Sequence, residues 1–378
     1  MGSLLVHEWI ERHGGSENVF AVLAQAFPEA EIRCLWNDAP ERFAGRVVTE
    51  SWMARTPLRR NKVAALPLMP TTWAHMDVSE YDAVLVSSHL FAHHIGGPVR
   101  DEGPRKYVYV HTPARYIWAP TLDHRGNNIA ARLAAPFLKR VDSQRAREGS
   151  IFAANSQFIR NRIRSAWQTD AEVIYPPVDV ARMQAQPTWR DQLGPRDEAI
   201  LASMPSQFIL GASRFVRYKR LDAVIDAGQA AGIPVVLAGA GPHRAQLVAA
   251  ASNSSVPVQF VDQPSDELLY ALYETALAFF FPAVEDFGIM PVEAMCLGTP
   301  VIVGDLGGAA ESVTALRGGV VLNSFTASSL KAGVEAALRV NMNFAREHAQ
   351  AMFGREVFLK RVVAWLGPTG STMLTERR

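Results

Sequence analysis

The sequence predicts an α/β protein built from two Rossmann-like, doubly wound domains. Its 378 residues exceed what one hydrophobic core usually serves, so two domains of roughly 150–200 residues are expected. Short apolar runs ending in Gly, Ser or His are followed by helix-like segments along the whole chain, as in parallel sheets with crossover helices. Two adjacent prolines near the middle, Pro176 and Pro177, end regular structure and indicate a linker.

Ten apolar runs are predicted to be strands of two parallel sheets. They are residues 4–7, 31–36, 83–87 and 107–111 in the first half, and 208–211, 234–239, 258–261, 277–281, 301–303 and 320–322 in the second. Apolar residues at helical spacing predict the crossover helices, as at Val19, Phe20 and Leu23. Ligands bind at the carboxyl ends of the strands in such sheets, so we expect a site in a crevice between two facing domains.

The predicted boundaries place residues 1–178 in an N-terminal domain and residues 179–354 in a second domain. The run Tyr-Pro-Pro-Val-Asp from Tyr175 to Asp179 is the expected linker, because its prolines stiffen the chain. Residues 355–378 are expected to form a helix that crosses back to the N-terminal domain, followed by a flexible tail from Gly367 onward.

Composition and charge argue against several classes of protein. The formal net charge is +1, so no bulk positive field exists to drive nonspecific nucleic-acid binding. Cys34 and Cys296 match no metal-ligand spacing and are expected to be reduced and buried. No signal-peptide pattern begins the chain, and no run approaches 18 consecutive apolar residues. We therefore expect a cytoplasmic protein.

The most informative motif is a pair of acids, Glu285 and Glu293, eight positions apart. The first follows the apolar run that ends at Pro282, and Gly288 is expected to open a helix that contains the second. The free N–H groups of a helix N-terminus bind ligand oxygens, so the two acids can address different parts of one elongated ligand. The alternative is that Glu285 caps the helix and Glu293 is a solvated helix residue.

A cationic loop follows the first predicted strand of the second domain. It carries Arg214 and Lys219, together with Arg217 and Arg220, ahead of a predicted helix. An arginine offers a bidentate fork and a lysine a mobile point charge, which suits a phosphate ligand. A solvated basic loop is the alternative.

The first domain contributes two further motifs. Gly14 and Gly15 follow the first strand, and paired glycines let the backbone approach a phosphate. Ser16 is expected to cap the next helix. These glycines do not form the Gly-x-Gly-x-x-Gly fingerprint, which argues against a nicotinamide-binding domain. His111 ends a predicted strand, where it can donate to a sugar hydroxyl or shuttle a proton, although a lone histidine is more often structural.

Two other stretches were weighed as sites. His89, His93 and His94 include an i, i+4 pair, but no third ligand is indicated and the apolar neighbours predict a packed helix, so no metal site is expected. Residues 52–62 mix cations with aromatic and aliphatic side chains, as interfacial segments do. The segment is therefore expected either to contact the inner face of a membrane peripherally or to form an ordinary acceptor-side surface.

The acid pair resembles the Glu-x7-Glu motif of retaining glycosyltransferases with the GT-B fold, in particular glycosyltransferase family four. The resemblance covers nearly the whole chain and implies two Rossmann-like domains, an acceptor-side N-terminal domain and a domain that binds the nucleotide sugar. It implies that Glu285 lies beside the donor sugar and that Glu293 binds the ribose hydroxyls. It also implies that backbone groups of Gly288, Ile289 and Met290 hold hydroxyls of the hexose.

The same resemblance assigns residues to the donor diphosphate. It implies that Arg214 and Lys219 stabilise the leaving pyrophosphate in place of a metal ion. It implies that the loop of Gly14 and Gly15 closes over the diphosphate, although Ser16 stands where the family commonly has alanine.

Further roles implied by the resemblance concern the base and the acceptor. Loops around Gly241 and Val261 are expected to recognise the base. His111 is expected near the reacting sugar, and Arg115 and Tyr116 near the acceptor. The pattern His-Thr-Pro-x-Arg-Tyr-x-Trp that begins at His111 resembles a subgroup associated with mannosyl transfer in polysaccharide assembly.

The resemblance therefore implies a retaining, metal-independent hexosyltransferase that needs no cofactor beyond its nucleotide-sugar co-substrate. GDP-mannose is the first candidate donor and UDP-sugars come next, with a glycan, a lipid-linked or a small-molecule acceptor. Another GT-B enzyme, such as an epimerase or a phosphorylase, is an alternative. So is a catalytically silent relative that acts as a binding partner.

Overall fold

The computed structural model describes residues 2–99, 103–120 and 129–375. The chain forms two compact units: unit 1 is Met1–Pro177 with Phe358–Arg378, and unit 2 is Val178–Val357. The first boundary follows the second linker proline, one residue before the predicted position. The second boundary falls inside helix α16 (Arg355–Leu366), so the end of the chain belongs to unit 1.

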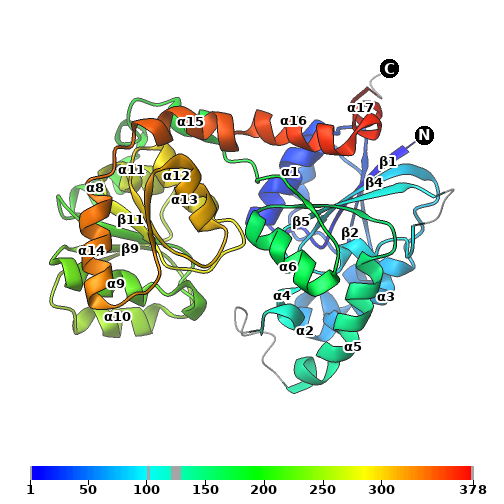
Figure 1. Ribbon diagram of the computed structural model, residues 1–378, viewed down its shortest axis with the longest axis horizontal. Helices are drawn as coiled ribbons and strands as arrows, with labels where there is room; N and C mark the ends of the chain where they lie inside the picture. Colours follow the sequence, from blue (N-terminus) through cyan, green and yellow to red (C-terminus); the bar gives the residue numbers. More distant parts are fainter. Residues whose placement is uncertain (1, 100–102, 121–128, 376–378) are drawn as a thin grey trace. The chain divides into compact units, whose positions relative to one another are not determined.

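In the described part of unit 1, seven parallel strands form one sheet in the order β3-β2-β1-β4-β5-β6-β7 (Figure 1). Their bounds are β1 Gly2–His7, β2 Glu31–Cys34, β3 Val48–Glu50, β4 Tyr81–Ser88, β5 Arg105–Val110, β6 Ile151–Ala154 and β7 Glu172–Val173. The four predicted strands are confirmed, although the second ends at Cys34 and not at Trp36. Strands β3, β6 and β7 were not predicted. Strands β3 and β7 have only three and two residues, which are too few to show a periodic pattern.

Helices cover both faces of this sheet because successive side chains of a strand point to opposite faces. The helices are α1 Gly15–Ala26, α2 Lys62–Ala65, α3 Met69–Ala74, α4 Arg115–Trp118, α5 Ile129–Ala146 and α6 Gln157–Trp167, with 3-10 helices η1 Pro40–Phe43, η2 Trp52–Arg55, η3 Pro57–Arg60, η4 Leu66–Leu68 and η5 Ala92–His94. Leu4 and Val6 of β1 belong to the core formed with α3, α5 and α6. Leu5, between them, belongs to the core formed with α1 and α16.

The last helices of the chain are part of unit 1. Phe358, Val362 and Leu366 of α16 are buried in the same core as Leu5, and the hydroxyl of Tyr107 donates to the carbonyl of Leu366 at 3.1 Å. The flexible tail expected from Gly367 is wrong over helix α17 (Pro368–Thr375). This segment is ordered by burial, since Met373 is 3% exposed. Residues 376–378 of that tail lie outside the described residues.

In unit 2, a sheet of six parallel strands has the order β10-β9-β8-β11-β12-β13 among the residues described. The bounds are β8 Ile209–Ala212, β9 Val235–Gly239, β10 Val258–Asp262, β11 Ala278–Phe281, β12 Val301–Gly304 and β13 Gly319–Leu322. Each of the six strands predicted for the second half is confirmed. The inner strands β8 and β11 are buried along their whole length, whereas the edge strands β10 and β13 are mostly partly buried. Continuous apolar runs are typical of strands in a parallel sheet.

The helices of unit 2 lie on the two faces of its sheet (Figure 1). They are α7 Val180–Gln184, α8 Pro195–Ala202, α9 Asp222–Ala231, α10 Arg244–Ser252, α11 Asp266–Thr275, α12 Ile289–Cys296, α13 Ala309–Leu316, α14 Ala327–Ala337 and α15 Asn343–Phe353, with 3-10 helices η8 Arg190–Gln192 and η9 Arg217–Lys219. Residues of α9, α10 and α14 share one core with Ile209, Leu237 and Phe280 of the strands.

The strand order of unit 2 reverses direction between β8 and β11. The chain runs outward from β8 through β9 to β10, and then returns to pair β11 with the other edge of β8, with Leu210 opposite Phe279. Loops at the carboxyl ends of two such strands leave in opposite directions and open a crevice, where ligands bind in doubly wound sheets. The fold therefore places the loops after β8 and β11 at a ligand-binding position.

Among the described residues, no helix is both long enough and apolar enough to cross a bilayer.

Candidate functional site

The switch point of unit 2 joins Lys219 to Glu285. Lys219 ends η9, in the loop after β8, and Glu285 lies in the loop after β11. The lysine Nζ donates to the glutamate Oε1 at 2.5 Å, and the two side chains are only 12% and 19% exposed. The predicted phosphate-binding lysine and the predicted sugar-side acid thus meet directly. A pair that is largely shielded from water keeps more of its electrostatic attraction than a surface pair does.

Arg214 lies in the same loop, five residues before Lys219. Its Nη2 donates to the hydroxyl of Tyr218 at 3.0 Å, and the side chain is exposed. The neighbouring Phe215 is fully buried and anchors the loop, with its N–H bonded to the carbonyl of Ala240 at 2.7 Å. The loop therefore holds one cation in an ion pair and presents a second, exposed cation at the carboxyl edge of the sheet.

The loop after β9 packs against the cationic loop through glycines. Gly239 and Gly241 have φ values of +141° and +152°, and a Cβ at Gly241 would lie 2.5 Å from the carbonyl oxygen of Phe215. A side chain there would displace the backbone beside Arg214, so Gly241 shapes the site. Val261 is 2% exposed inside β10, and its side chain belongs to the core. Base recognition by these two loops stays a prediction.

Gly288 begins the helix that carries the second acid, as predicted. It is the N-cap of α12 with φ of +87°, and a Cβ there would lie 3.0 Å from Cβ of Ala309. Ile289 and Met290 form the first turn, whose N–H groups have no partner within the helix because they precede its first hydrogen bonds. The loop from Glu285 therefore leads directly into a helix N-terminus suited to ligand oxygens.

The adjacent glycines Gly307 and Gly308, after β12, pack against the loop that carries Glu285. No role was predicted for them. The N–H of Gly308 donates to the carbonyl of Glu285 at 2.8 Å, and a Cβ at Gly308 would lie 2.2 Å from the carbonyl oxygen of Asp286. A Cβ at Gly307 would lie 2.8 Å from the carbonyl of Glu285. The signal in the sequence is the pair of adjacent glycines that begins four positions after the predicted strand 301–303.

Glu293 lies one turn into α12 and is partly buried. Burial, and secondarily the charge of Asp266, raises the pKa of Glu293 from its ordinary value of 4.5 to about 7. A buried carboxyl group with a strongly raised pKa is typical of a ligand-binding position. The structure thus disfavours the alternative that Glu293 is a solvated helix residue.

At the carboxyl edge of the unit 1 sheet, three adjacent strands bring two histidines and a serine together. His7 ends β1, Ser87 lies in β4, and His111 directly follows β5. The Nδ1 of His7 lies 3.1 Å from both the carbonyl oxygen and the Oγ of Ser87, and that Oγ lies 2.8 Å from Nε2 of His111. Burial lowers the pKa of each imidazole to about 3, so both rings are neutral at physiological pH.

Glu8, which the sequence analysis missed, folds the loop after β4. Its fully buried carboxylate accepts hydrogen bonds from the backbone N–H groups of His89, Leu90 and Ala92 at 2.8 to 3.2 Å, and from Oγ of Ser88 at 3.2 Å. Burial raises the pKa of Glu8. This carboxylate turns the chain sharply after Ser87 and so fixes the edge of the sheet beside His111.

The glycine pair of unit 1 begins helix α1. Gly14 is the N-cap in an extended conformation, and a Cβ there would lie 2.0 Å from Oε2 of Glu17. The expectation that Ser16 caps this helix is wrong, because Ser16 lies inside the helix and donates to Glu17 at 2.8 Å. Glu17 is 3% exposed, and burial raises its pKa. Gly15 is the first residue of α1, so its N–H points out of the helix end.

The predicted acceptor residues lie on the short helix α4. Arg115 is partly buried, whereas Tyr116 is 7% exposed and belongs to the hydrophobic core. Little of the tyrosine surface is therefore available to an acceptor, and acceptor binding by Arg115 and Tyr116 stays a prediction. Trp118, two residues later, donates from Nε1 to Asp142 at 2.6 Å, which ties α4 to α5.

His93 and His94 do have a third polar partner, contrary to expectation. Their Nε2 atoms each lie 3.2 Å from Oδ1 of Asp142, while Oδ2 accepts from Nε1 of Trp118 and Trp167 at 2.6 and 2.7 Å. The packed helix expected here is the short 3-10 helix η5. Nε2 of His94 and Nε1 of the two tryptophans hydrogen-bond to this carboxylate, whereas Nε2 of His93 lies at contact distance without a hydrogen bond among the described residues. The cluster is a hydrogen-bond hub centred on Asp142.

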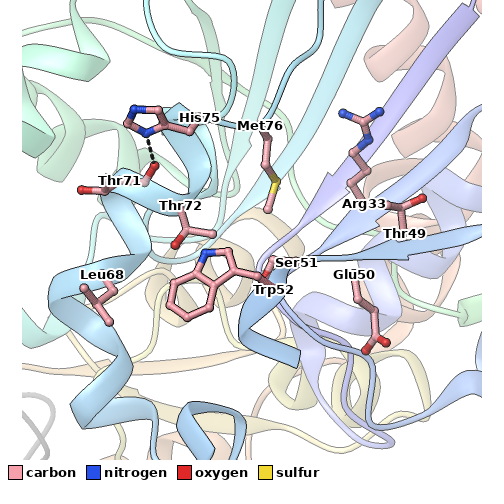
Figure 2. Close-up of a pocket in the computed structure, with 10 residues that line it drawn as sticks. All are labelled: Arg33, Thr49, Glu50, Ser51, Trp52, Leu68, Thr71, Thr72, His75 and Met76. Atoms are coloured by element: carbon pink, nitrogen blue, oxygen red, sulfur yellow. Dashed lines mark hydrogen bonds between the residues drawn. The ribbon is translucent and has the colours of Figure 1, made fainter. Parts of the chain in front are cut away.

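A pocket of about 380 Å³ lies elsewhere in unit 1, beside Trp52 at the start of the predicted interfacial stretch (Figure 2). Its lining residues are Arg33, Thr49, Glu50, Ser51, Trp52, Leu68, Thr71, Thr72, His75 and Met76. Trp52 and Leu68 are 54% and 43% exposed, which is unusual for such large apolar side chains. Arg55 and Arg60 are exposed close by in sequence, so apolar and cationic groups share this surface.

Solved structures share the architecture of both units. HepE of Anabaena, crystallised with UDP, aligns with a TM-score of 0.71 and 19% identity over 97% of this chain and 99% of that one. WaaG, a glycosyltransferase involved in lipopolysaccharide biosynthesis, aligns with a TM-score of 0.64 and 16% identity over 97% and 100%. The two parallel, doubly wound sheets thus define a GT-B fold.

Sequence comparison identifies the family. Residues 13–182 match Glycosyltransferase Family 4, and residues 196–352 match Glycosyl transferases group 1. The chain belongs to the family of GT4-type glycosyltransferases.

Curated relatives match parts of the chain. The D-rhamnosyltransferase WbpZ of Pseudomonas aeruginosa is 30% identical over 180 residues, which are 47% of this chain and 42% of WbpZ. The GDP-mannose-dependent alpha-(1-6)-phosphatidylinositol monomannoside mannosyltransferase of Mycobacterium tuberculosis is 29% identical over 218 residues, 53% of this chain and 55% of that protein. The chain thus spans about half the length of these relatives.

Proposed function

We propose that this protein is a retaining, metal-independent glycosyltransferase that moves a hexose from a nucleotide-diphosphate donor to an acceptor hydroxyl. The observation that carries the proposal is the Lys219–Glu285 pair at the β8–β11 switch point, directly ahead of the N-terminus of α12. A cation, an acid and a row of backbone N–H donors are the groups needed to hold a sugar diphosphate.

Lys219 and Arg214 would neutralise the charge that develops on the departing diphosphate. Glu285 keeps the ammonium of Lys219 in place before the donor arrives, so little reorganisation is needed during the reaction. The acceptor oxygen attacks the anomeric carbon from the face that the diphosphate leaves, the bond from that carbon to the phosphate oxygen breaks, and the acceptor proton passes to the diphosphate. Configuration is then retained.

Glu293 would accept hydrogen bonds from the ribose hydroxyls in its ionised form. Its pKa of about 7 makes donor binding depend on pH across neutrality. The first turn of α12, from Gly288 to Met290, would hold hydroxyls of the hexose with backbone groups.

GDP-mannose is the donor we propose first. The mycobacterial relative is GDP-mannose-dependent by name, and O-antigen chain mannosyltransferase C of Escherichia coli is 28% identical over 123 residues, 32% of this chain and 30% of that protein. A UDP-sugar is the second candidate, since the structurally similar HepE binds UDP and UDP-glucose. No cofactor is needed for either reaction.

A lipid-linked acceptor would suit the exposed surface of Trp52 and Leu68. Large apolar side chains next to the exposed cations Arg55 and Arg60 favour contact with an anionic bilayer surface. Sedimentation with vesicles of phosphatidylcholine and phosphatidylglycerol tests this. Binding that is lost in Trp52→Ala supports it, and equal sedimentation with and without vesicles contradicts it.

Thermal-shift measurements with GDP, UDP, GDP-mannose and UDP-glucose test the donor. A ligand present at a hundred times its Kd stabilises the folded state by about 2.7 kcal/mol. Product analysis then tests the reaction: acceptor-dependent glycoside with the donor's anomeric configuration, unchanged by EDTA, is expected. Donor consumption without an acceptor-dependent product would favour an epimerase or a phosphorylase. Binding without any turnover would favour a silent relative.

A further inference from the structure

We propose that Ser87 is a positioning residue that fixes His111 as the Nδ1–H tautomer, so that His111 acts as a hydrogen-bond donor and not as a base. The catalytic part of this inference rests on the proposed glycosyltransferase function. The tautomer itself rests only on the contacts among His7, Ser87 and His111 in unit 1.

The direction of the hydrogen bonds follows from the carbonyl group of Ser87. A carbonyl oxygen can only accept, and it lies 3.1 Å from Nδ1 of His7, so that nitrogen must carry the proton. The Nδ1–H of His7 also lies 3.1 Å from Oγ of Ser87. The ring of His7 is held in this orientation by stacking on Phe20, with centroids 4.8 Å apart and an interplanar angle of 13°.

The hydroxyl group of Ser87 then has a single hydrogen-bond acceptor to which it can donate. The side chain is fully buried, and within residues 2–99, 103–120 and 129–375 its Oγ makes hydrogen bonds only with the two imidazoles. His7 already donates, so it cannot accept at Nδ1. The proton of Oγ therefore points at Nε2 of His111, 2.8 Å away, because a buried hydroxyl proton is costly to leave unpaired.

His111 must accept at Nε2, and a neutral imidazole that accepts at one nitrogen carries its proton on the other. Both histidines are neutral at physiological pH, because burial depresses their pKa values. His111 retains an 8% exposed fraction, so its ring is not sealed inside the core. Its Nδ1–H can donate to an oxygen of the donor sugar or of the acceptor, but it cannot take a proton from one.

The tautomer can be read directly by NMR in the full chain with 15N-labelled histidine. Long-range proton–nitrogen correlations distinguish a protonated from an unprotonated ring nitrogen, and a His111→Gln variant assigns the signals. The expected result is a protonated Nδ1 and an unprotonated Nε2 at His111 in the unmodified protein. The reverse pattern, or a doubly protonated ring at neutral pH, overturns the inference. This result is independent of any transferase activity.

Ser87→Ala and Ser88→Ala form a matched pair for the positioning role. Both serines are fully buried and adjacent, but Oγ of Ser88 bonds to Glu8 at 3.2 Å and not to a histidine. Ser87→Ala should shift His111 toward a mixture of tautomers, and Ser88→Ala should leave the tautomer unchanged. An unchanged His111 spectrum in a folded Ser87→Ala protein overturns the assignment.

The kinetic expectation is a fall of about tenfold in kcat for Ser87→Ala with a smaller change in the donor KM, since one hydrogen bond that orients a donor in the transition state is lost. His111→Gln should fall at least as far. If the tautomer is as stated but Ser87→Ala retains full kcat, the positioning role is wrong. If neither the unmodified protein nor any variant transfers sugar, the proposed function is wrong, but the tautomer measured by NMR is unaffected.

Discussion

Lys219 and Glu285 are 66 positions apart in the chain, yet the lysine Nζ donates to the glutamate Oε1 at 2.5 Å. They come from the loops after β8 and β11, the two neighbouring strands at which the sheet order reverses. The ion pair also lies near the ring of Phe281, whose centroid is 5.7 Å from Nζ. The arrangement holds a cation at the position where we expect a ligand diphosphate.

Glu285→Gln should separate binding of the nucleotide from transfer of the sugar. Removing the carboxylate charge beside Lys219 frees its ammonium for phosphate, so GDP should bind as tightly as before or more tightly. Transfer should fall by roughly 100-fold or more, because a group beside the reacting sugar is lost. Calorimetry and initial rates measure the two effects. Glu335→Gln, an exposed change on α14, is the control. Parallel loss of GDP affinity and rate would contradict this separation.

Gly308→Ala should lower both stability and kcat, although residue 308 is not expected to contact a ligand. The added Cβ would lie 2.2 Å from the carbonyl oxygen of Asp286, so the backbone that carries Glu285 must move. We expect a loss of about 1–3 kcal/mol in the free energy of unfolding and a lower kcat. Gly194→Ala is the matched control, since nothing lies within 4 Å of its added Cβ. Equal stability and rate in the two variants would show that the close contact is unimportant.

Glu293→Gln should remove a pH dependence near neutrality. The folded-state pKa is raised to about 7 from 4.5, so the folded protein binds more protons than the unfolded chain between these values. The contribution of Glu293 to stability is therefore present below pH 4.5 and is lost as the pH rises to 7, on the order of 3 kcal/mol. Denaturation between pH 5 and pH 8 should show the variant gaining stability relative to the unmodified protein. A constant difference across this range contradicts the raised pKa.

Asp142→Asn should destabilise unit 1. The carboxylate accepts from Trp118, Trp167 and His94, and an amide with one acceptor oxygen cannot accept from all three. We expect a loss of about 3 kcal/mol in the free energy of unfolding, measured by denaturation with tryptophan fluorescence. The matched change Asp82→Asn, at an exposed position of β4, should cost little. If Asp142→Asn unfolds at the same denaturant concentration as Asp82→Asn, the hydrogen bonds of Asp142 do not contribute to the stability of the protein.

Stability should also fall in mild acid because of the buried histidines. His7 and His111 have folded-state pKa values of about 3, below their ordinary 6.5, so the unfolded chain takes up more protons between these values. The folded state therefore loses stability as the pH falls from 6.5 toward 3. The double variant His7→Asn with His111→Gln should show a flatter profile of unfolding free energy over this range. An equally steep profile would assign the acid sensitivity to other groups.

Local sequence patterns predicted the strand, the loop and the helix that carry the candidate site residues, and the roles of these residues stay predictions. Glu285, Gly288 and Glu293 follow one buried apolar run, and the strand, loop and helix that carry them are consecutive in the sequence. Lys219 was predicted in the same way. That Lys219 and Glu285 meet could not be predicted, because it depends on which strands are neighbours, and many strand orders fit the same ten apolar runs.

The parts of the structure that were missed depend on contacts between distant segments. Glu8 receives its donors from residues about 80 positions later, and the Asp142 hub joins residues from four elements. No role was predicted for Ser87, because its contacts with the two histidines depend on β1, β4 and β5 being adjacent. Ser16 was assigned as a cap from its residue type, but the helix begins one residue earlier.

Calorimetric titration with GDP tests the central claim most directly, namely that the cations after β8 hold the donor diphosphate. Arg214→Ala and Lys219→Ala should each raise the Kd by about tenfold to a hundredfold, since each loses a charge-assisted hydrogen bond worth roughly 1.5–3 kcal/mol. Lys331→Ala, an exposed change on α14, should bind as the unmodified protein does. Equal GDP affinity in all four proteins would contradict the account.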